Sequence, residues 1–466
     1  MFIKLFSFVF LIYISTNVRV EGYKEASGYV TVRPDAHMFW WLFNANAGLN
    51  NNSYALPLVI WLQVIWLQVI WLQGGPGASS TGFGNFNEIG PQDVNLKTRT
   101  TSWIKYANLL FIDNPVGTGY SYVSKSSAYT KDNKQISIDL VTLLKEFYKQ
   151  SPEFEVKINS CNCNEVLNAF PLQSTPLYIF SESYGGKMTA GFAVELHKAI
   201  QNNEIKANFK GIALGDSWIS PIDSVATWGE YLFSLSYIDR NQKSQIDAKA
   251  NDIREALKSG QYTRATSLWG SLEGLVSMLT GGVDWYNVLY GSDNQLKNRK
   301  YAMKMNGLQT PLNRSIIKHL GRYHNDQLDT IMNGVIKTKL KIPSSVTWGG
   351  QSGEVFQELS TDFMKPGVDD VDYLLNSTDL KVVVYTAQLD LIVDTIGTLD
   401  WIHSLKWSGL KDFEASARSE ITSGGEIAAY YQSHKNFHLY WILKAGHMVP
   451  SDQGNTALTM LQKIIQ

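Results

Sequence analysis

Short apolar runs recur along the chain, and each has the length of one strand that is buried on both faces. These runs occupy residues 107–113, 177–181, 209–215, 380–386 and 438–445. Between them, apolar residues three and four positions apart indicate amphipathic helices, of which the clearest are 135–150 and 187–200. Buried strands that alternate with helices predict the α/β class, with a doubly wound, mostly parallel sheet.

Two segments depart from this alternation. Residues 28–33 and 36–43 read as two strands around a turn, which predicts a hairpin that opens the fold. From about 220 to 340 the chain shows helical spacing with few strand signals. We therefore expect a helical cap to be inserted in this part of the chain.

The strand before the first glycine-rich turn contains a repeat. Val-Ile-Trp-Leu-Gln occurs three times in tandem, at 59–63, 64–68 and 69–73, directly before Gly74. One strand over 58–73 would span about 53 Å at ~3.3 Å per residue, whereas strands usually have ~5–6 residues. We expect the third copy to form the strand, because it adjoins the glycines, and the two copies before it to bulge out. A duplication error in the gene or its assembly is the alternative.

Composition and charge narrow the class of protein. The chain has 466 residues and a formal net charge of −1, and it carries no block of Lys or Arg of the kind that binds nucleic acid. The charged start and the apolar stretch 5–15 are typical of a secretory signal peptide over 1–22, although an apolar first strand is the alternative. We therefore expect 23–466 to be the mature domain, secreted or lysosomal and without a membrane segment.

The sequence also contains sites for covalent modification. Three Asn-x-Ser/Thr triplets, at Asn51, Asn313 and Asn376, predict N-glycosylation if the chain enters the secretory pathway. Cys161 and Cys163 are the only cysteines, and residues that close in sequence rarely bridge each other. They are free thiols or join another chain, since a metal site needs more ligands than this stretch offers. The fold must therefore rest on its core rather than on disulfides.

A serine lies between a predicted strand and a predicted helix. Ser183 follows the strand at 177–181 and precedes the helix at 187–200, with Ser181 two residues before it and Gly185 two after. Small residues at these positions are typical of a nucleophile elbow, whose turn is too tight for larger side chains. An ordinary strand-to-helix turn is the alternative, because so short a pattern is frequent by chance.

Two further polar residues follow strands later in the chain. The strand at 380–386 leads to Asp390, and the strand at 438–445 leads to His447. Ligand chemistry in such sheets collects at the carboxyl ends of the strands. Together with Ser183, the order serine, acid, histidine is that of the α/β-hydrolase triad. The sequence therefore predicts an α/β-hydrolase fold.

Serine chemistry requires these residue types. A serine hydroxyl is a poor nucleophile until a neutral imidazole takes its proton, and a carboxylate fixes the tautomer of the imidazole and stabilises its cation. Asp394 competes with Asp390 for the acid, and we favour Asp390 because it lies nearer the strand end. The backbone N–H groups of Tyr184 and Gly75 are the natural donors to the oxyanion that develops.

Four motifs in this order resemble the serine carboxypeptidase family. They are Trp71–Gly77, Asp113–Ser121, Glu182–Gly186 and Gly446–Pro450. The similarity extends from about Gly28 to the C-terminus. The residues that look most like the retinoid-inducible branch of that family are 36–41, 181–188 and 388–394.

The resemblance implies a serine-type carboxypeptidase, which hydrolyses C-terminal residues from peptides through an acyl-enzyme and needs no metal or organic cofactor. It assigns the triad to Ser183, Asp390 and His447, and the oxyanion hole to Gly75 and Tyr184. It also implies that the substrate's terminal carboxylate is bound by Trp71, Gln73, Glu88 and Glu182. Two close glutamates cannot both ionise cheaply, so a shared proton favours acidic pH, although ordinary loop charges are the alternative for this pair.

The sequence departs from the family pattern within these motifs. Gln73 stands where much of the family has asparagine, Ser181 where it has glycine, and Ala78 where a cysteine is common. The triple repeat is unlike the family and adjoins the oxyanion loop. Two other functions fit the same scaffold, namely an esterase or acyltransferase and a catalytically silent secreted binding protein.

Overall fold

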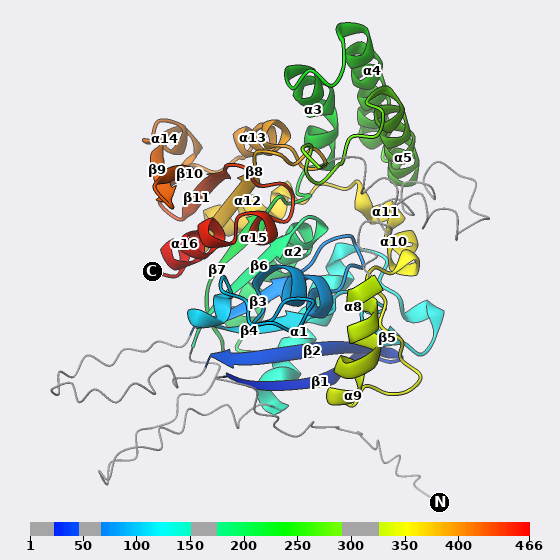
Figure 1. Cartoon of the computed structure of the whole chain (residues 1–466), viewed down its shortest axis with the longest axis vertical. Coiled ribbons are helices and arrows are strands. Elements are labelled where there is room, and N and C mark those ends of the chain that lie inside the picture. The colour runs from blue at the N-terminus through cyan, green and yellow to red at the C-terminus, as the bar shows by residue number, and fades with distance from the viewer. Residues whose placement is uncertain (1–22, 46–66, 151–174, 291–325) are drawn as a thin grey trace, which may run out of the picture.

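The computed structural model describes residues 23–45, 67–150, 175–290 and 326–466 (Figure 1). Within them, strands from the whole length of the chain form one sheet. The strands are β1 (Tyr23–Arg33), β2 (Ala36–Ala45), β3 (Leu67–Leu72), β4 (Ala107–Ile112), β5 (Tyr122–Val123), β6 (Pro176–Glu182), β7 (Asn208–Gly215), β8 (Lys381–Ala387), β9 (Ser419–Ser423), β10 (Glu426–His434) and β11 (Phe437–Ile442). Their order across the sheet is β1-β2-β4-β3-β6-β7-β8-β11-β10-β9, and β5 pairs with β2.

The centre of the sheet is parallel and its two sides are antiparallel. Strands β4, β3, β6, β7, β8 and β11 pair in parallel along that order. The hairpin of β1 and β2 lies at one side, and β10 and β9 extend the other. The prediction of a mostly parallel sheet is therefore confirmed, and so is the opening hairpin.

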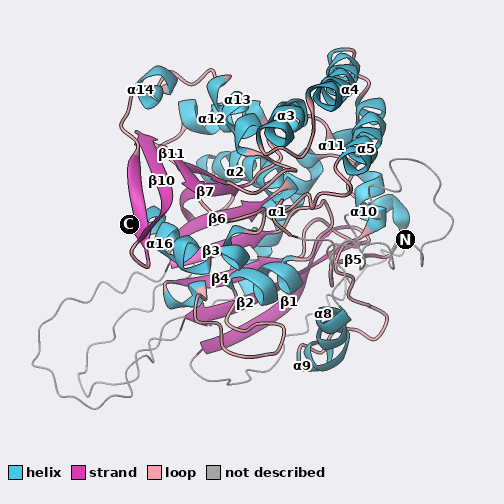
Figure 2. Cartoon of the chain, turned by 45° about the horizontal axis from the view of Figure 1, so that its top comes forward, coloured by secondary structure: helices cyan, strands magenta, loops and turns pink. Residues whose placement is uncertain are grey.

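Helices cover both faces of the sheet (Figure 2). They are α1 (Asn133–Gln150), α2 (Tyr184–Gln201), α3 (Pro221–Ser234), α4 (Arg240–Lys258), α5 (Tyr262–Leu279), α8 (Asp326–Ile331), α9 (Lys337–Lys339), α10 (Gly353–Glu358), α11 (Ser360–Phe363), α12 (Val368–Ser377), α13 (Thr395–His403), α14 (Leu410–Glu414), α15 (Val449–Asp452) and α16 (Gly454–Ile465). Helices of other types are the ten-residue π-helix η1 (Ser80–Ile89) and the shorter η2 (Trp103–Lys105), η3 (Ser126–Ala128) and η5 (Met332–Ile336). Helix α2 packs against α1 and α12.

Helices α3, α4 and α5 project beyond the sheet and are drawn in green at the top of Figure 1. Helix α3 packs on α4, and α4 packs on α5. Helix α4 starts with a capping box, in which Asp239 accepts from the N–H of Gln242 at 2.8 Å and the Gln242 side chain accepts from the N–H of Asp239 at 2.8 Å. These helices occupy the part of the chain where the sequence predicts a cap. Residues 291–325 of that expected cap lie outside the described residues.

The core beneath the carboxyl ends of β3 and β6 is aromatic. Trp71 meets Trp103 edge-on, with ring centroids 5.7 Å apart. Trp103 in turn meets Phe180 of β6 with centroids 5.0 Å apart. Edge-to-face pairs of this kind contribute ~0.5–1.5 kcal/mol each beyond the burial of their area. They form a rigid base under the residues that follow both strands.

Strand β3 begins two residues before the third copy of the repeat. All of its residues are buried, and the prediction that the third copy forms the strand is confirmed. The strand also takes Leu67 and Gln68 from the second copy, since Leu67 pairs with Ala107 of β4 and Gln68 accepts a hydrogen bond of 3.1 Å from Tyr148. Residues 59–66 of the repeat lie outside the described residues.

Some boundaries and strands differ from the sequence prediction. The sequence predicts no strand at β9 or β10, because their residues are mostly exposed or half-buried and so form no apolar run. Strand β1 begins at Tyr23 rather than at 28, because its first residues are polar but still pair with β2. Strand β11 ends at Ile442, before the predicted end at 445.

Several expectations concern residues that the structure does not describe, namely the signal peptide at 1–22, Asn51, Cys161, Cys163 and Asn313. Asn376 is described, and it is exposed near the end of α12. Its Nδ2 donates a hydrogen bond of 3.0 Å to the carbonyl of Asp372.

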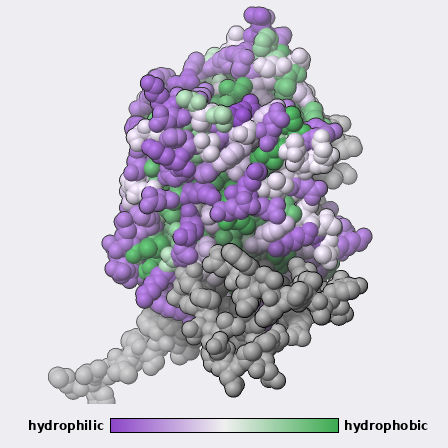
Figure 3. All heavy atoms as spheres, turned by 90° about the vertical axis from the view of Figure 1, so that its left-hand side faces the viewer, coloured by the Kyte–Doolittle hydropathy of each residue, from purple (hydrophilic) through white to green (hydrophobic). Residues whose placement is uncertain are grey.

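Figure 3 shows a face on which hydrophilic and apolar side chains are interspersed. Among the described helices, none has the length and hydropathy needed to span a bilayer.

Candidate active site

Four polar residues follow four neighbouring strands of the sheet. Ser183 follows β6, Asp216 follows β7, Asp390 follows β8 and His447 follows β11, and these strands are adjacent in that order. The carboxyl ends of parallel strands meet at the same edge of a sheet, where ligands bind in such folds. This edge therefore holds the three residues predicted as a triad, together with Asp216, which the sequence analysis does not single out.

Ser183 occupies a tight turn between β6 and α2. Its backbone has φ 61° and ψ −132°, a conformation that residues other than glycine rarely adopt. Its N–H donates to the carbonyl of Gly215 at 3.0 Å, and its carbonyl accepts from the N–H of Trp218 at 2.9 Å. A Cβ added at Gly185 would lie 2.3 Å from the carbonyl oxygen of Leu72, so a larger residue does not fit there. This is the geometry of a nucleophile elbow.

His447 and Asp390 form a fully buried pair. His447 Nδ1 lies 2.7 Å from Asp390 Oδ2, and both side chains are 0% exposed. Asp390 Oδ1 accepts from the N–H groups of Ile392 at 3.0 Å and Val393 at 3.3 Å. Burial raises the pKa of Asp390, whereas His447 and these N–H groups lower it. His447 Nε2 has no hydrogen-bond partner among the described residues, so this nitrogen is available as a base.

Asp394, the alternative acid, makes different contacts. It caps α13, where its Oδ1 accepts from the N–H of Gly397 at 3.0 Å. Its Oδ2 accepts from Thr227 Oγ1 at 2.8 Å. Burial raises the pKa of Asp394 to about 7. The acid that contacts His447 is therefore Asp390, and Asp394 acts as a helix cap.

Two residues outside the predicted set hold the loop that carries His447. The His447 N–H donates to the carbonyl of Tyr286 at 2.6 Å, and the two rings meet edge-on with centroids 5.0 Å apart. Asp452 Oδ2 accepts from the N–H of Gly446 at 2.8 Å and from Asn287 Nδ2 at 2.9 Å. Tyr286 is distant from His447 in the sequence, whereas Asp452 lies only six residues after Gly446, and no motif in the sequence marks either residue.

The glycine loop after β3 lies against the elbow. A Cβ added at Gly74 would lie 2.4 Å from Ser183 Cβ and 2.8 Å from the backbone nitrogen of Tyr184. Gly75 has φ +122°, which favours glycine, and a turn is closed by a hydrogen bond of 3.0 Å from the N–H of Ala78 to the carbonyl of Gly74. The loop that contains the predicted donor Gly75 therefore packs directly against Tyr184, the other predicted donor.

A chain of buried hydrogen bonds leads from β3 to the residue before the serine. Trp71 Nε1 donates to Gln73 Oε1 at 2.7 Å, and Gln73 Nε2 donates to Glu182 Oε1 at 2.8 Å. All three side chains are fully buried. The glutamine thus uses both ends of its amide, which fixes its orientation. Glu88, which is 1% exposed and belongs to η1, lies in the same buried environment as Gln73 and Glu182.

The two glutamates share this buried environment. Burial raises the pKa of Glu88 to about 7, with Glu182, His447, Gln73 and Arg99 opposing the shift. Burial and then the charge of Glu88 hold the pKa of Glu182 well above its ordinary value. Both carboxyl oxygens of Glu88 and Oε2 of Glu182 lack a hydrogen bond of normal geometry among the described residues. At acidic pH the pair therefore carries protons that it can donate.

Asp216 is a further buried carboxyl at this edge. Its Oδ1 accepts from the N–H of Ala387 at 2.8 Å, which ties the end of β7 to the end of β8. Its Oδ2 has no hydrogen-bond partner among the described residues. Burial, followed by the charge of Asp390, holds the pKa of Asp216 well above its ordinary value. Its place directly after the predicted strand at 209–215 is the signal that could have identified it.

Comparison with protein families matches the chain to the model described as serine carboxypeptidase, over residues 16–63 and 68–466. The chain belongs to the serine carboxypeptidase family. It is similar to the retinoid-inducible serine carboxypeptidase of Mus musculus, with 47% identity over 448 residues, which cover 95% of this chain and 92% of the relative. The relative of that name from Homo sapiens is 46% identical over 450 residues, or 96% of this chain and 92% of the relative. These matches confirm the family and the branch that the motifs predict.

A solved structure supports the fold. The chain is similar to the crystal structure of Kex1(Δ)p, a prohormone-processing carboxypeptidase from Saccharomyces cerevisiae, with a TM-score of 0.71 and 21% identity. The similarity covers 95% of this chain and 91% of that one. At this level of identity it concerns the fold alone, and it confirms the α/β-hydrolase prediction.

The family match of this serine carboxypeptidase is interrupted at residues 64–67, within the second copy of the repeat. The match resumes at Gln68, one residue after the start of β3. Three of the four unmatched residues thus precede the strand that leads to the site, and the fourth, Leu67, is its first residue. From Gln68 onward, the strand and the glycines after it lie within the family match.

Proposed function

We propose that this serine carboxypeptidase releases single residues from the C-termini of peptides at acidic pH, through an acyl-enzyme on Ser183. The observation that carries this proposal is the buried chain from Trp71 through Gln73 to Glu182, which ends at the residue before Ser183. A carboxylate bound by this chain holds the last peptide bond of a substrate beside the serine. Internal peptide bonds have no such carboxylate, so they are not cleaved.

The proposed steps are those of a serine, histidine and aspartate triad, in which Asp390 holds His447 Nδ1 and leaves Nε2 available as the base. His447 Nε2 takes the proton of Ser183 Oγ while Oγ bonds to the carbonyl carbon of the last peptide bond. The N–H groups of Tyr184 and Gly75 stabilise the oxyanion, and removal of one such donor typically costs ~10²–10³ in rate. The C–N bond then breaks, and His447 gives its proton to the departing amine. A water molecule, deprotonated by the same nitrogen, hydrolyses the acyl bond and restores Ser183.

Acidic pH favours binding of the substrate's carboxylate. A third carboxylate next to Glu88 and Glu182 binds only when protons on the pair offset the repulsion. The pKa of about 7 for Glu88 means that the pair loses a proton as the pH rises toward neutrality and above. We therefore propose that kcat/KM is higher near pH 5 than near pH 8, because KM rises as that proton is lost.

Three measurements test the function. Ser183→Ala should lower kcat by at least about 10³-fold, and a fluorophosphonate should label wild type but not this variant. Amidation of the peptide's C-terminus should remove most of the turnover of wild type. Rapid cleavage of amidated peptides would overturn the carboxylate-binding role and favour an esterase. A wild-type Ser183 that stays unlabelled would indicate a silent binding protein.

We also propose that the chain enters the secretory pathway, on the signal-like start at 1–22 and the exposed sequon at Asn376. The mature protein should then begin near Gly22 and carry a glycan on Asn376. N-terminal sequencing and glycosidase treatment of the protein expressed in a eukaryotic cell test both points. A product that retains its first 22 residues and lacks glycans would contradict the proposal.

A further inference from the structure

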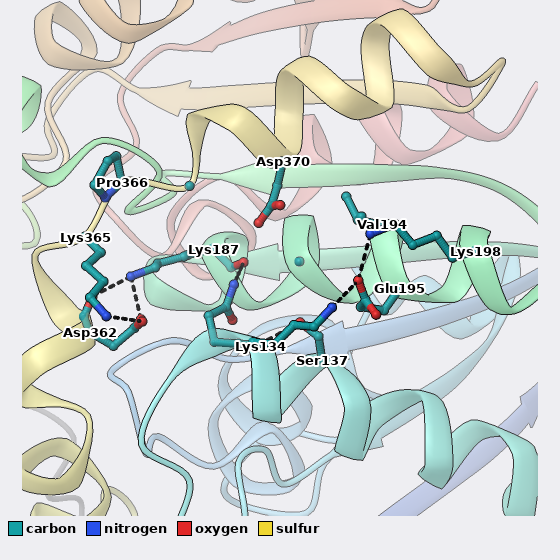
Figure 4. A pocket seen from close by; sticks show the side chains of 13 residues that line it. Lys134, Ser137, Lys187, Val194, Glu195, Lys198, Asp362, Lys365, Pro366 and Asp370 are labelled. Carbon is teal, nitrogen blue, oxygen red and sulfur yellow. Dashed lines mark hydrogen bonds and ion pairs between the residues drawn. The ribbon is translucent and has the colours of Figure 1, made fainter.

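Three polar side chains are buried next to the elbow, and the mechanism uses none of them directly. Tyr184 and Lys187 come from the first turn of α2, and Asp362 comes from α11. Their residues are 0%, 2% and 4% exposed, respectively. Figure 4 shows Lys187 extending to Asp362 at the edge of a cavity of about 270 Å³. The ion pair thus joins the helix that follows the nucleophile to a segment nearly 180 residues further along the chain.

Asp362 is the centre of this network. Its Oδ2 accepts from Tyr184 Oη at 2.7 Å and from Lys187 Nζ at 2.6 Å. Lys187 Nζ also donates to the Asp362 carbonyl at 2.5 Å and lies 5.2 Å from the centroid of the Tyr184 ring. The Tyr184 hydroxyl and the ammonium therefore converge on one oxygen, and the charge of Lys187 is shared between that oxygen and the ring.

The segment that carries Asp362 also contacts the elbow through its next residue, Phe363. The next residue, Phe363, stacks on the Tyr184 ring at 6.0 Å with 13° between the planes. Its carbonyl accepts from Trp218 Nε1 at 3.1 Å, and the Trp218 N–H donates to the Ser183 carbonyl at 2.9 Å. Asp362 and Phe363, both from the short helix α11, thus restrain the positions of Ser183 and Tyr184.

A buried ion pair is by itself weak evidence for a role in stability. Two charges lose their hydration when they are buried, and replacing a buried ion pair with apolar residues of similar volume is often neutral or stabilising. Burial accordingly lowers the pKa of Lys187, while Asp362 opposes the shift. Instead, the pair fixes the position of the Tyr184 hydroxyl. This hydroxyl is hydrogen-bonded to the Asp362 carboxylate, which Lys187 holds in place, so it cannot shift without breaking a charge-assisted hydrogen bond.

We propose that Asp362 and Lys187 are positioning residues for the oxyanion hole, which act by holding the ring, and hence the backbone N–H, of Tyr184. The inference rests on the proposed role of that N–H as an oxyanion donor. Catalytic donors must be held within about 0.5 Å of their productive place. The peptide group of Tyr184 is bonded to the strained residue Ser183, and its side chain is the part that the surrounding structure can hold.

Tyr184→Phe is the test, because it removes one hydroxyl and keeps the ring. We expect kcat on peptides to fall about 5–20-fold with KM changed less than twofold, since a misplaced donor costs transition-state stabilisation. A peptide aldehyde, which forms an oxyanion when Ser183 adds to it, should bind more weakly by the same factor. Benzylsuccinate, which binds through its carboxylates and forms no oxyanion, should bind as it does to wild type.

Tyr148→Phe is the matched control. It also removes a buried hydroxyl that donates to a side chain, Gln68 Oε1 at 3.1 Å, but from α1 rather than from the elbow. Its kcat and its affinity for the aldehyde should equal those of wild type, whatever its thermal stability. A Tyr184→Phe enzyme that matches Tyr148→Phe in both readouts, or that changes KM alone, would overturn the proposal.

A second set of variants separates positioning from folding. Lys187→Met with Asp362→Leu replaces the pair by apolar groups of similar size, and its melting temperature should stay within a few degrees of wild type. Its kcat should fall about as far as that of Tyr184→Phe, and adding Tyr184→Phe should cause less than a twofold further loss. If Tyr184→Phe lowers kcat by the same factor in this variant as in wild type, the two changes act independently and the proposed network is wrong. The rate of fluorophosphonate labelling of Ser183 gives the same comparison even if peptides prove not to be substrates.

Discussion

Glu88→Gln removes an ionisable group from the buried pair, and its effect on stability can be worked out from the structure. Glutamine has nearly the shape of a protonated glutamate and stays neutral at every pH. The Glu88 carboxyl is buried beside Glu182, and none of its oxygens has a hydrogen bond of normal geometry among the described residues. In wild type, folding must therefore keep this carboxyl protonated or accept a buried charge.

The size of the effect follows from the pKa. Burial raises the pKa of Glu88 from 4.5 to about 7. The folded protein holds the proton more tightly than the unfolded chain, so stability falls as the pH rises from 4.5 to 7. A shift of about 2.5 units at ~1.4 kcal/mol per unit gives a loss of about 3 kcal/mol, complete above pH 7 and absent below pH 4.5.

Urea unfolding at pH 4.5 and pH 7.5 measures this loss. Between the two values, wild type should lose about 3 kcal/mol more of its unfolding free energy than Glu88→Gln does. Glu420→Gln, an exposed position on β9, is the control and should behave as wild type. Equal pH dependence in wild type and Glu88→Gln would refute the reasoning, because it would mean that the folded protein does not hold a proton on Glu88.

Two further predictions concern the other carboxyl groups. Asp390→Asn should lower kcat about 10⁴-fold, because its amide oxygen stays with the N–H groups of Ile392 and Val393 and its NH₂ group, a donor, then faces His447 Nδ1 and favours the wrong imidazole tautomer. Asp394→Asn should stay within about threefold because asparagine is an equally good helix cap. Steady-state kinetics at pH 5 distinguish them, and equal losses would contradict the assignment of the acid. Asp216→Asn should keep the stability of wild type, since it retains an acceptor for the Ala387 N–H and burial favours the neutral form of the carboxyl. Asp216→Ala should cost about 1–3 kcal/mol by leaving that N–H unpaired. Thermal unfolding at pH 5 checks this, and an Asp216→Asn protein as unstable as Asp216→Ala would show that a charged carboxylate is needed.

The features that the sequence predicts are those set by local physics. A run such as 107–113 is apolar because both faces of a central strand are buried, and small residues around Ser183 are dictated by one tight turn. The order of triad residues then follows from where strands end. These constraints act over a few residues, so a single sequence reveals them.

The features that the sequence does not predict depend on contacts between segments that are distant along the chain. Asp362 lies on a helix of four residues and meets Tyr184 across 178 positions, and nothing around it marks a partner. Tyr286 holds the backbone of His447 from a distant element in the same way, and Asn287 reaches Asp452 across 165 positions. Strands β9 and β10 are half-exposed, so their pairing with β11 leaves no apolar run in the sequence.

The repeat shows how such a long-range contact selects one register. The six residues of β3, Leu67–Leu72, have the same sequence as residues 62–67, so a slip of one repeat would place identical side chains in the core. Core packing alone cannot distinguish the two registers. In the slipped register Val69 would take the place of Gly74, where a Cβ would lie 2.4 Å from that of Ser183 and 2.7 Å from the carbonyl oxygen of the residue before it. The glycine that brings the oxyanion loop against the serine is therefore also what fixes the third copy in the sheet.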